Sequence, residues 1–190
     1  EKLKIGQSIQ KINNKRYKVI SNIKGLKNKK FKNIRFVIGI GSNYTRFKVV
    51  EDLKKKKIFL KWGKVVSKNA IINGDVHIGD GAVVFSGVVI SNESKIGDHC
   101  FIGPNSCLEH NNIFNNFSSC GAGVNCGGRV NVGKYSFLGI GTSVRHQISI
   151  KDNCIIGGQS LVIKNCIKNS LYFGIPAKKK KNWKFSYKYL

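Results

Sequence analysis

The sequence has 190 residues, which is enough for one main domain and a small second one. Its 34 Lys and Arg outnumber 9 Asp and Glu, and the net charge of +25 favours anionic partners such as phosphorylated cofactors. No helix-turn-helix, RNA-recognition or zinc-finger pattern accompanies this charge, so we expect no nucleic-acid partner. No apolar run approaches the length of a membrane span and the start lacks a signal-peptide core, so we expect a cytoplasmic protein with no membrane partner.

The first part of the chain, residues 1–62, follows no repeat and contains one α/β fragment. Residues 34–40 (IRFVIGI) predict a buried strand that ends at Gly41, and residues 44–57 predict a helix. A strand, a glycine turn and a helix N-terminus together suit an anion, although simple packing explains this corner equally well.

Three further features belong to this fragment. Ser42 or Asn43 is the expected N-cap of the helix. Residues 58–62 predict a strand that leads onward, and residues 17–22 predict an earlier strand of the same sheet. The chain contains no Met, so we expect it to be a piece of a longer polypeptide.

The middle of the chain, residues 63–166, repeats every six residues. Neither the helical period of 3.6 nor the strand period of 2 explains a strict six, whereas a chain that turns a corner after every short strand does. Each repeat has an apolar residue at the same position. The residue after it is often Gly, which suits corners with a positive φ or a close backbone approach. The apolar positions are Val66, Ile72, Ile78, Val84, Ile90, Ile96, Ile102, Leu108, Phe114, Cys120, Cys126, Val132, Leu138, Val144, Ile150, Ile156 and Val162.

Three such hexapeptides make one triangular coil of eighteen residues, so the apolar positions form three inner columns of a prism. Successive members of a column lie about 4.8 Å apart, the spacing of neighbouring strands. The sequence therefore predicts an all-β solenoid. Five of the six cysteines fall on its inward or small-residue positions and are expected to be buried filler.

The last segment, residues 167–190, is predicted to be a basic C-terminal tail. Residues 171–177 (LYFGIPA) lead into a run of four lysines at 178–181, and the aromatic and lysine residues that follow indicate a docking tail.

With its repeats, the Glu109 and His110 pair and the terminal YFGIPAK, the chain resembles the hexapeptide-repeat sugar acetyltransferases, particularly the bacillosamine-pathway and sialic-acid group. The resemblance implies a left-handed parallel β-helix that binds acetyl-CoA and a small Rossmann-like N-terminal domain that binds a nucleotide amino sugar. It also implies a homotrimer with active sites between subunits. The Gly-rich first strand of that N-terminal domain is missing, since residues 1–14 contain only Gly6.

Carried over by position, the resemblance implies that His110 is the general base, a task that suits a neutral imidazole. The carboxylate that follows this histidine in the family is Asn111 here, which can orient the ring but cannot stabilise an imidazolium by charge. The other histidines, His77, His99 and His146, are expected to be structural or exposed.

The family's cofactor contacts map onto Ser119, Ile140 and Gly158, and Ser119 replaces a histidine of the family. Ile140 and Gly158 are eighteen residues apart, so they are expected to stack on adjacent coils and form a lane for the pantetheine arm. Gly41 matches the turn that approaches the sugar nucleotide.

The leading hypothesis is therefore an acetyl-CoA-dependent N-acetyltransferase acting on a UDP- or dTDP-linked 4-amino sugar, without a metal. One alternative is a sugar O-acetyltransferase with the same base. Another is a catalytically impaired trimeric scaffold, which the changes at Asn111 and Ser119 favour. A γ-type carbonic anhydrase would need three zinc-binding histidines, and His99 and His110 lack a third.

Overall fold

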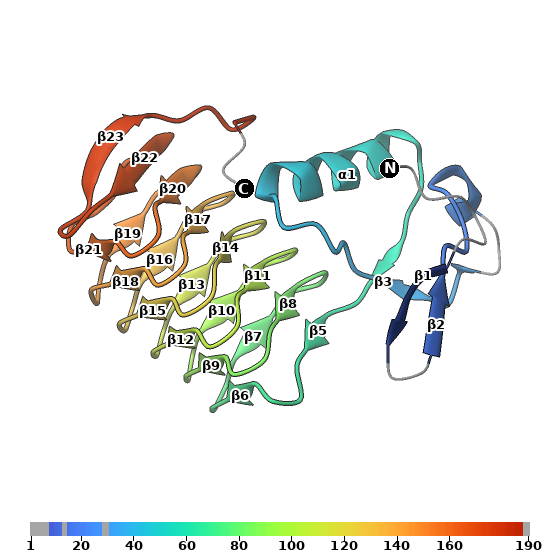
Figure 1. Ribbon diagram of the computed structural model, residues 1–190, viewed down its shortest axis with the longest axis horizontal. Coiled ribbons are helices and arrows are strands. Elements are labelled where there is room, and N and C mark those ends of the chain that lie inside the picture. Colours follow the sequence, from blue (N-terminus) through green and yellow to red (C-terminus); the bar gives the residue numbers. More distant parts are fainter. Residues whose placement is uncertain (1–7, 13–14, 28–30, 188–190) are drawn as a thin grey trace.

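The computed structural model describes residues 8–12, 15–27 and 31–187 of the chain. These residues form a parallel β-solenoid with one α-helix beside it (Figure 1). From residue 65 to residue 162, each coil gives one short strand to each of three sheets, and paired residues are eighteen apart, as in Phe101 with Ser119. The predicted left-handed β-helix is confirmed.

Three sheets form the faces of the prism, and their strands are parallel except for the last one. The eight-stranded sheet contains β5 (Val65–Val66), β8 (Val83–Val84), β11 (Phe101–Ile102), β14 (Ser119–Cys120), β17 (Phe137–Leu138), β20 (Cys154–Ile156), β22 (Ser170–Phe173) and β23 (Lys178–Asn182). The six-stranded sheet contains β6 (Ile71–Ile72), β9 (Val89–Ile90), β12 (Cys107–Leu108), β15 (Asn125–Cys126), β18 (Ser143–Val144) and β21 (Leu161–Val162). The five-stranded sheet contains β7 (His77–Ile78), β10 (Lys95–Ile96), β13 (Ile113–Phe114), β16 (Asn131–Val132) and β19 (Ser149–Ile150).

The predicted inward columns form the core. Ile102, Leu108 and Phe114, one from each column, are fully buried, and burying such a side chain contributes about 1.5–3 kcal/mol. Val66 in the first coil is 38% exposed, because no earlier coil covers it. The six cysteines are free, and all except Cys107 are buried, as the sequence predicted.

The glycines that follow the inward residues serve close backbone approach, the second of the two roles that the sequence suggested, and none of them has a positive φ. A Cβ on Gly103 or Gly139 would lie 2.4 Å from backbone atoms of the next coil. Positive φ angles occur instead three residues after the inward residue. Most residues there have side chains, including Glu93 (φ 59) and Asn111 (φ 57).

Before the solenoid lie two small units. A hairpin pairs β1 (Ser8–Ile12) with β2 (Lys15–Lys18), and a short 3-10 helix, η1 (Lys24–Lys27), follows it. The second unit is a strand–helix–strand arrangement in which β3 (Arg35–Phe36) pairs in parallel with β4 (Lys61–Trp62). The helix between them is α1 (Asn43–Lys55), and Ser42 is its N-cap, as predicted.

The predicted strands of this region were too long. Only two residues of the expected strand 34–40 and two of 58–62 are paired, because β3 and β4 have only each other as partners among the described residues. The expected strand 17–22 overlaps the end of β2, which belongs to the separate hairpin, so its assignment to the β3 sheet was wrong.

Helix α1 packs on the solenoid through two buried polar side chains. The Arg46 guanidinium donates from Nε to the His99 carbonyl (3.0 Å) and from Nη2 to the Ser119 hydroxyl (2.7 Å), and it stacks over the Phe101 ring. Asn43 donates from its amide to the Ser136 carbonyl (3.0 Å). These bonds reach three successive coils and therefore fix the height of the helix along the prism.

Beside these bonds, aromatic rings from successive coils form a stack under the helix. The His99 and Phe117 rings are stacked with centroids 4.9 Å apart, and Tyr135 continues the stack at 5.8 Å. Phe47 of α1 packs edge-on against Phe117 and Tyr135. Phe185 from the C-terminal segment packs on Tyr135, so that segment docks on the same stack.

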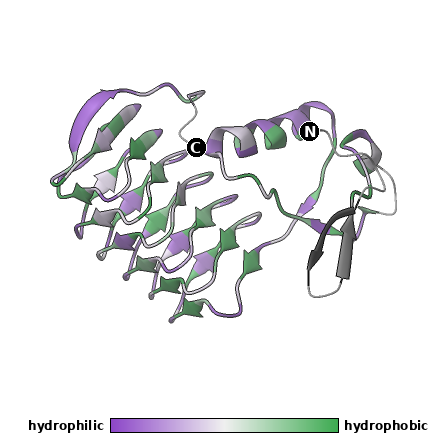
Figure 2. Cartoon of the chain, in the orientation of Figure 1, coloured by the Kyte–Doolittle hydropathy of each residue, from purple (hydrophilic) through white to green (hydrophobic). Residues whose placement is uncertain are grey.

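The C-terminal segment also continues the solenoid. Its strand β22 pairs in parallel with β20, and β23 folds back antiparallel onto β22. Figure 2 shows β23 as hydrophilic, in line with its exposed lysines. Charged side chains on an edge strand discourage pairing with other chains.

The position of His99 predicts an acid sensitivity. Its side chain is 4% exposed, and Nδ1 has no hydrogen-bond partner among the residues that the structure describes. Burial lowers the pKa of His99; the charge of Asp98 opposes this, and the Arg46 guanidinium adds to it. Below the usual value of 6.5 the unfolded chain therefore binds a proton that the folded chain does not, so acid reduces the free energy of unfolding.

We expect His99→Phe, which keeps a ring in the stack, to flatten this dependence. Urea unfolding of both proteins at about pH 7.5 and pH 5.5, on either side of the usual histidine value, measures it. The wild-type protein should lose more stability on acidification than the variant. Equal losses would contradict the prediction.

Candidate active site

The three edges of the prism carry different surfaces, and the predicted site residues are spread over all three. The histidine edge joins the six-stranded to the five-stranded sheet and includes residues 109–112, 127–130 and 145–148. The helix edge joins the five-stranded to the eight-stranded sheet and carries α1 on residues 97–100, 115–118 and 133–136. The glycine edge closes the triangle with residues 121–124, 139–142 and 157–160.

His110 lies on the histidine edge in an open cleft of about 250 Å³. The cleft is lined by Glu109, His110, Gly128, Arg129, His146 and Gln147. His146 lies two coils above His110 in the same column, and it shares this cleft. The imidazole of His110 is exposed, so a ligand can reach it.

Gly128, one coil above His110, leaves the space that the imidazole occupies. A Cβ built on Gly128 would lie 2.5 Å from Nε2 of His110 and 2.7 Å from Cε1. Gly128 was not among the predicted site residues. Its position eighteen residues after His110 is the signal that identifies it.

A chain of two hydrogen bonds holds the other side of the His110 ring. Nδ1 of His110 lies 2.8 Å from Oδ1 of Asn111, and the Asn111 amide donates to a carboxylate oxygen of Glu93. Asn111 therefore orients the ring. A carboxylate is still present, but it bonds to Asn111 and not directly to His110 as the family pattern implies. Sequence reasoning missed Glu93, which lies eighteen residues before Asn111 and so directly beneath it.

On the glycine edge, Ile140 and Gly158 stack on adjacent coils as the repeat predicts. The backbone N–H of Gln159 donates to the Ile140 carbonyl (2.8 Å), and a Cβ on Gly158 would lie 3.1 Å from that carbonyl oxygen. Ile140 is 63% exposed. An apolar side chain beside exposed backbone makes a surface on which a flexible aliphatic arm can lie.

Ser119 and Gly41 lie outside both the His110 cleft and the surface around Ile140. Ser119 is 2% exposed and its hydroxyl bonds to Arg46 and Asn43, so α1 covers the position predicted to touch the cofactor. We therefore leave Ser119 out of the candidate cofactor surface. Gly41 is exposed at the bend before α1, and its carbonyl accepts a hydrogen bond from Arg46 Nη1 (2.7 Å).

Two broader features bear on the chemistry. Within the described residues, no group of three His, Cys, Asp or Glu side chains is arranged to hold a metal ion. No helix of that same part of the chain is long and apolar enough to cross a membrane.

Comparison with known proteins identifies part of the repeat. The bacterial transferase hexapeptide family (six repeats) matches residues 75–110. The repeat match covers the two coils that contain Glu93 and His110.

Solved structures that share this fold include acyltransferases. The acetyltransferase domain of PglB from Neisseria gonorrhoeae is 20% identical with a TM-score of 0.80, and the match covers 86% of this chain and 80% of that one. PerB from Caulobacter crescentus, crystallised with CoA and GDP-perosamine, is 24% identical with a TM-score of 0.73 over 86% and 79% of the two chains. A mutant of AntD, an N-acyltransferase from Bacillus cereus, was crystallised with dTDP-4-amino-4,6-dideoxyglucose and coenzyme A. It is 19% identical with a TM-score of 0.56, over 71% of this chain and 89% of that one.

The space above the His110 ring yields a prediction about how the ring is held. Gly128→Ala adds a methyl group where Nε2 lies, and the ring is the flexible partner, so the ring should move while the coil stays. We expect a crystal structure of the variant to show His110 turned away from Asn111. The free energy of unfolding should change by only about 0.5 kcal/mol. A ring that keeps its wild-type position beside the added methyl group would contradict the prediction.

Proposed function

We propose that the protein is an acetyl-CoA-dependent N-acetyltransferase that acts on the amine of a nucleotide-linked amino sugar. The observation that carries the proposal is the exposed His110 imidazole, whose Nδ1 bonds to Asn111 in an open cleft. The shared fold supports it. By their descriptions, the PglB structure is an acetyltransferase domain, the Caulobacter crescentus protein is a GDP-perosamine N-acetyltransferase, and AntD is an N-acyltransferase. The net charge of +25 suits two substrates that both carry phosphates.

His110 serves as the general base. As the amine nitrogen attacks the thioester carbonyl, Nε2 accepts the proton that the nitrogen loses, and a C–N bond forms. The tetrahedral intermediate then collapses, the C–S bond breaks, and the imidazolium returns the proton to the departing thiolate. The products are an N-acetyl sugar and CoA, so proton and charge balance without a metal.

The glycine edge is the proposed surface for acetyl-CoA. Ile140 offers an exposed apolar side chain, and Gly158 lets the pantetheine arm approach the backbone closely. The bend at Gly41 is the proposed contact for the sugar nucleotide, where α1 directs its N-terminus and its capped first turn. These roles rest on the family resemblance together with exposure.

The positions of these surfaces support a homotrimer as part of the proposal. His110 and Ile140 occupy different edges of one prism, separated by a full sheet face, so a single subunit does not bring base and cofactor together. If three prisms pack around a threefold axis, the histidine edge of one faces the glycine edge of its neighbour. Each active site then takes His110 from one subunit and Ile140 from another.

Removal of the base tests the activity. We expect the wild-type protein to release CoA thiol with a UDP- or dTDP-linked 4-amino sugar, and His110→Ala to lower kcat by about 100-fold or more. His77→Ala, which removes an exposed histidine on the five-stranded sheet, is the matched control and should keep its rate. Faster turnover of a hydroxyl analogue would favour an O-acetyltransferase. No turnover on any acceptor would favour a scaffold.

A mixed trimer tests whether the site is shared. His110→Ala and Ile140→Asp should each be nearly inactive alone. Co-expressed in equal amounts, they should give about a quarter of the wild-type activity, because random assembly leaves that share of sites with both residues intact. Activity no higher than that of either variant alone would place both residues of a site in one subunit.

A further inference from the structure

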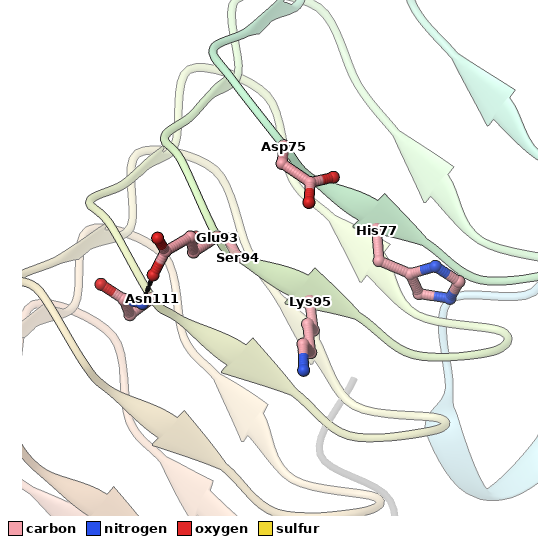
Figure 3. A pocket seen from close by; sticks show the side chains of 6 residues that line it. All are labelled: Asp75, His77, Glu93, Ser94, Lys95 and Asn111. Carbon is pink, nitrogen blue, oxygen red and sulfur yellow. Dashed lines mark hydrogen bonds between the residues drawn. The ribbon is translucent and has the colours of Figure 1, made fainter.

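Glu93 lies at the end of the hydrogen-bond chain that begins at His110. Figure 3 shows its bond to Asn111. We propose that Glu93 is a positioning residue that fixes the tautomer of His110 through Asn111. This inference rests on the proposed function, because it concerns the state of the proposed base. It assigns a role to a carboxylate that the reaction does not touch directly.

The donors and acceptors of the chain determine its direction. A carboxylate only accepts hydrogen bonds, so the NH2 group of Asn111 must face Glu93. The amide oxygen of Asn111 must then face His110, and it too can only accept. Nδ1 of His110 therefore carries the proton, and Nε2 keeps its lone pair for the incoming amine.

The backbone holds the three side chains in this order. Glu93 and Asn111 occupy equivalent corners of adjacent coils, both with a left-handed φ. The backbone N–H of Glu93 donates to the Asp75 carbonyl (2.7 Å), and the backbone N–H of Asn111 donates to the Asn92 carbonyl (2.9 Å). The two side chains thus start from fixed points one coil apart, which is within reach of a single hydrogen bond.

Without the carboxylate, the same asparagine loses its preferred direction. An amide can rotate by half a turn and exchange its oxygen and nitrogen at no steric cost. The NH2 group would then face Nδ1, which would have to accept, and the ring proton would move to Nε2. That tautomer has no lone pair at Nε2 and does not act as a base there.

Removal of the carboxylate charge is the first test. In Glu93→Gln we expect kcat for acetyl transfer to fall about 10- to 100-fold with KM for acetyl-CoA nearly unchanged, as is typical when the partner that orients a histidine is altered. Asp75→Asn is the matched control, because it removes the same charge one coil further from His110, on a side chain that does not bond to Asn111 (Figure 3). Its kcat should stay at the wild-type level.

Exchange of the two polar groups is the second test. In the double variant Glu93→Gln with Asn111→Asp, the Gln amide donates to the new carboxylate, and that carboxylate again accepts from Nδ1. The tautomer is restored although both side chains have changed. We expect kcat to return to within about 3-fold of wild type, a coupling that independent sites would not show. A double variant no better than Glu93→Gln would overturn the inference.

The tautomer itself is the readout that does not depend on turnover. Imidazole ¹⁵N shifts, recorded at about pH 8.5 where histidines are generally neutral, should show His110 protonated at Nδ1 in the wild type and the double variant, but not in Glu93→Gln. A wild-type ring protonated at Nε2, or one unchanged by Glu93→Gln, would overturn the inference even in an active enzyme. Absence of turnover on every acceptor would instead overturn the proposed function, and the ¹⁵N shifts would still decide the role of Glu93.

Discussion

The eighteen-residue register between coils is the constraint on which the rest of the structure depends. Each inner strand of the solenoid bonds to the strands of the coils on both sides, so its residues have fixed neighbours eighteen positions away. The buried columns hold this register, because a shift of one residue would turn the inward side chains to the solvent. Glu93 beneath Asn111 and Gly128 above His110 are consequences of the same rule.

Because the register fixes the core, the three edges are free to differ. The helix edge has aromatic rings that support α1, the glycine edge exposes Ile140 among glycines, and the histidine edge carries polar groups around His110. Each coil thus contributes to three unlike surfaces without a change in its buried positions. A site that needs two of these surfaces has to be assembled from neighbouring prisms.

The sequence predicts well those features that repeat at a fixed, short interval along the chain. The columns, the stacking of Ile140 on Gly158 and the buried cysteines all follow from counting by six and eighteen. The N-terminal strands were overestimated, because strand length depends on how many partners a strand finds and not on its own apolar run. The burial of Ser119 could not be predicted for a related reason: the α1 side chains that cover it come from far away in the sequence. Glu93 could have been found by counting back eighteen residues from Asn111. It was missed because the expected carboxylate was looked for next to His110 in the sequence.

The buried Arg46 links the proposed substrate corner to the level of the base. Its guanidinium bonds to the Gly41 carbonyl on one side and to the His99 carbonyl on the other, and His99 begins the coil that also contains His110. A buried guanidinium without these acceptors would be costly, so the bend at Gly41 cannot slide along the prism without breaking several bonds at once. Ser119 therefore has a structural role, because its hydroxyl bonds to Arg46 and Asn43 and helps to hold the N-terminal unit at the level of the proposed base.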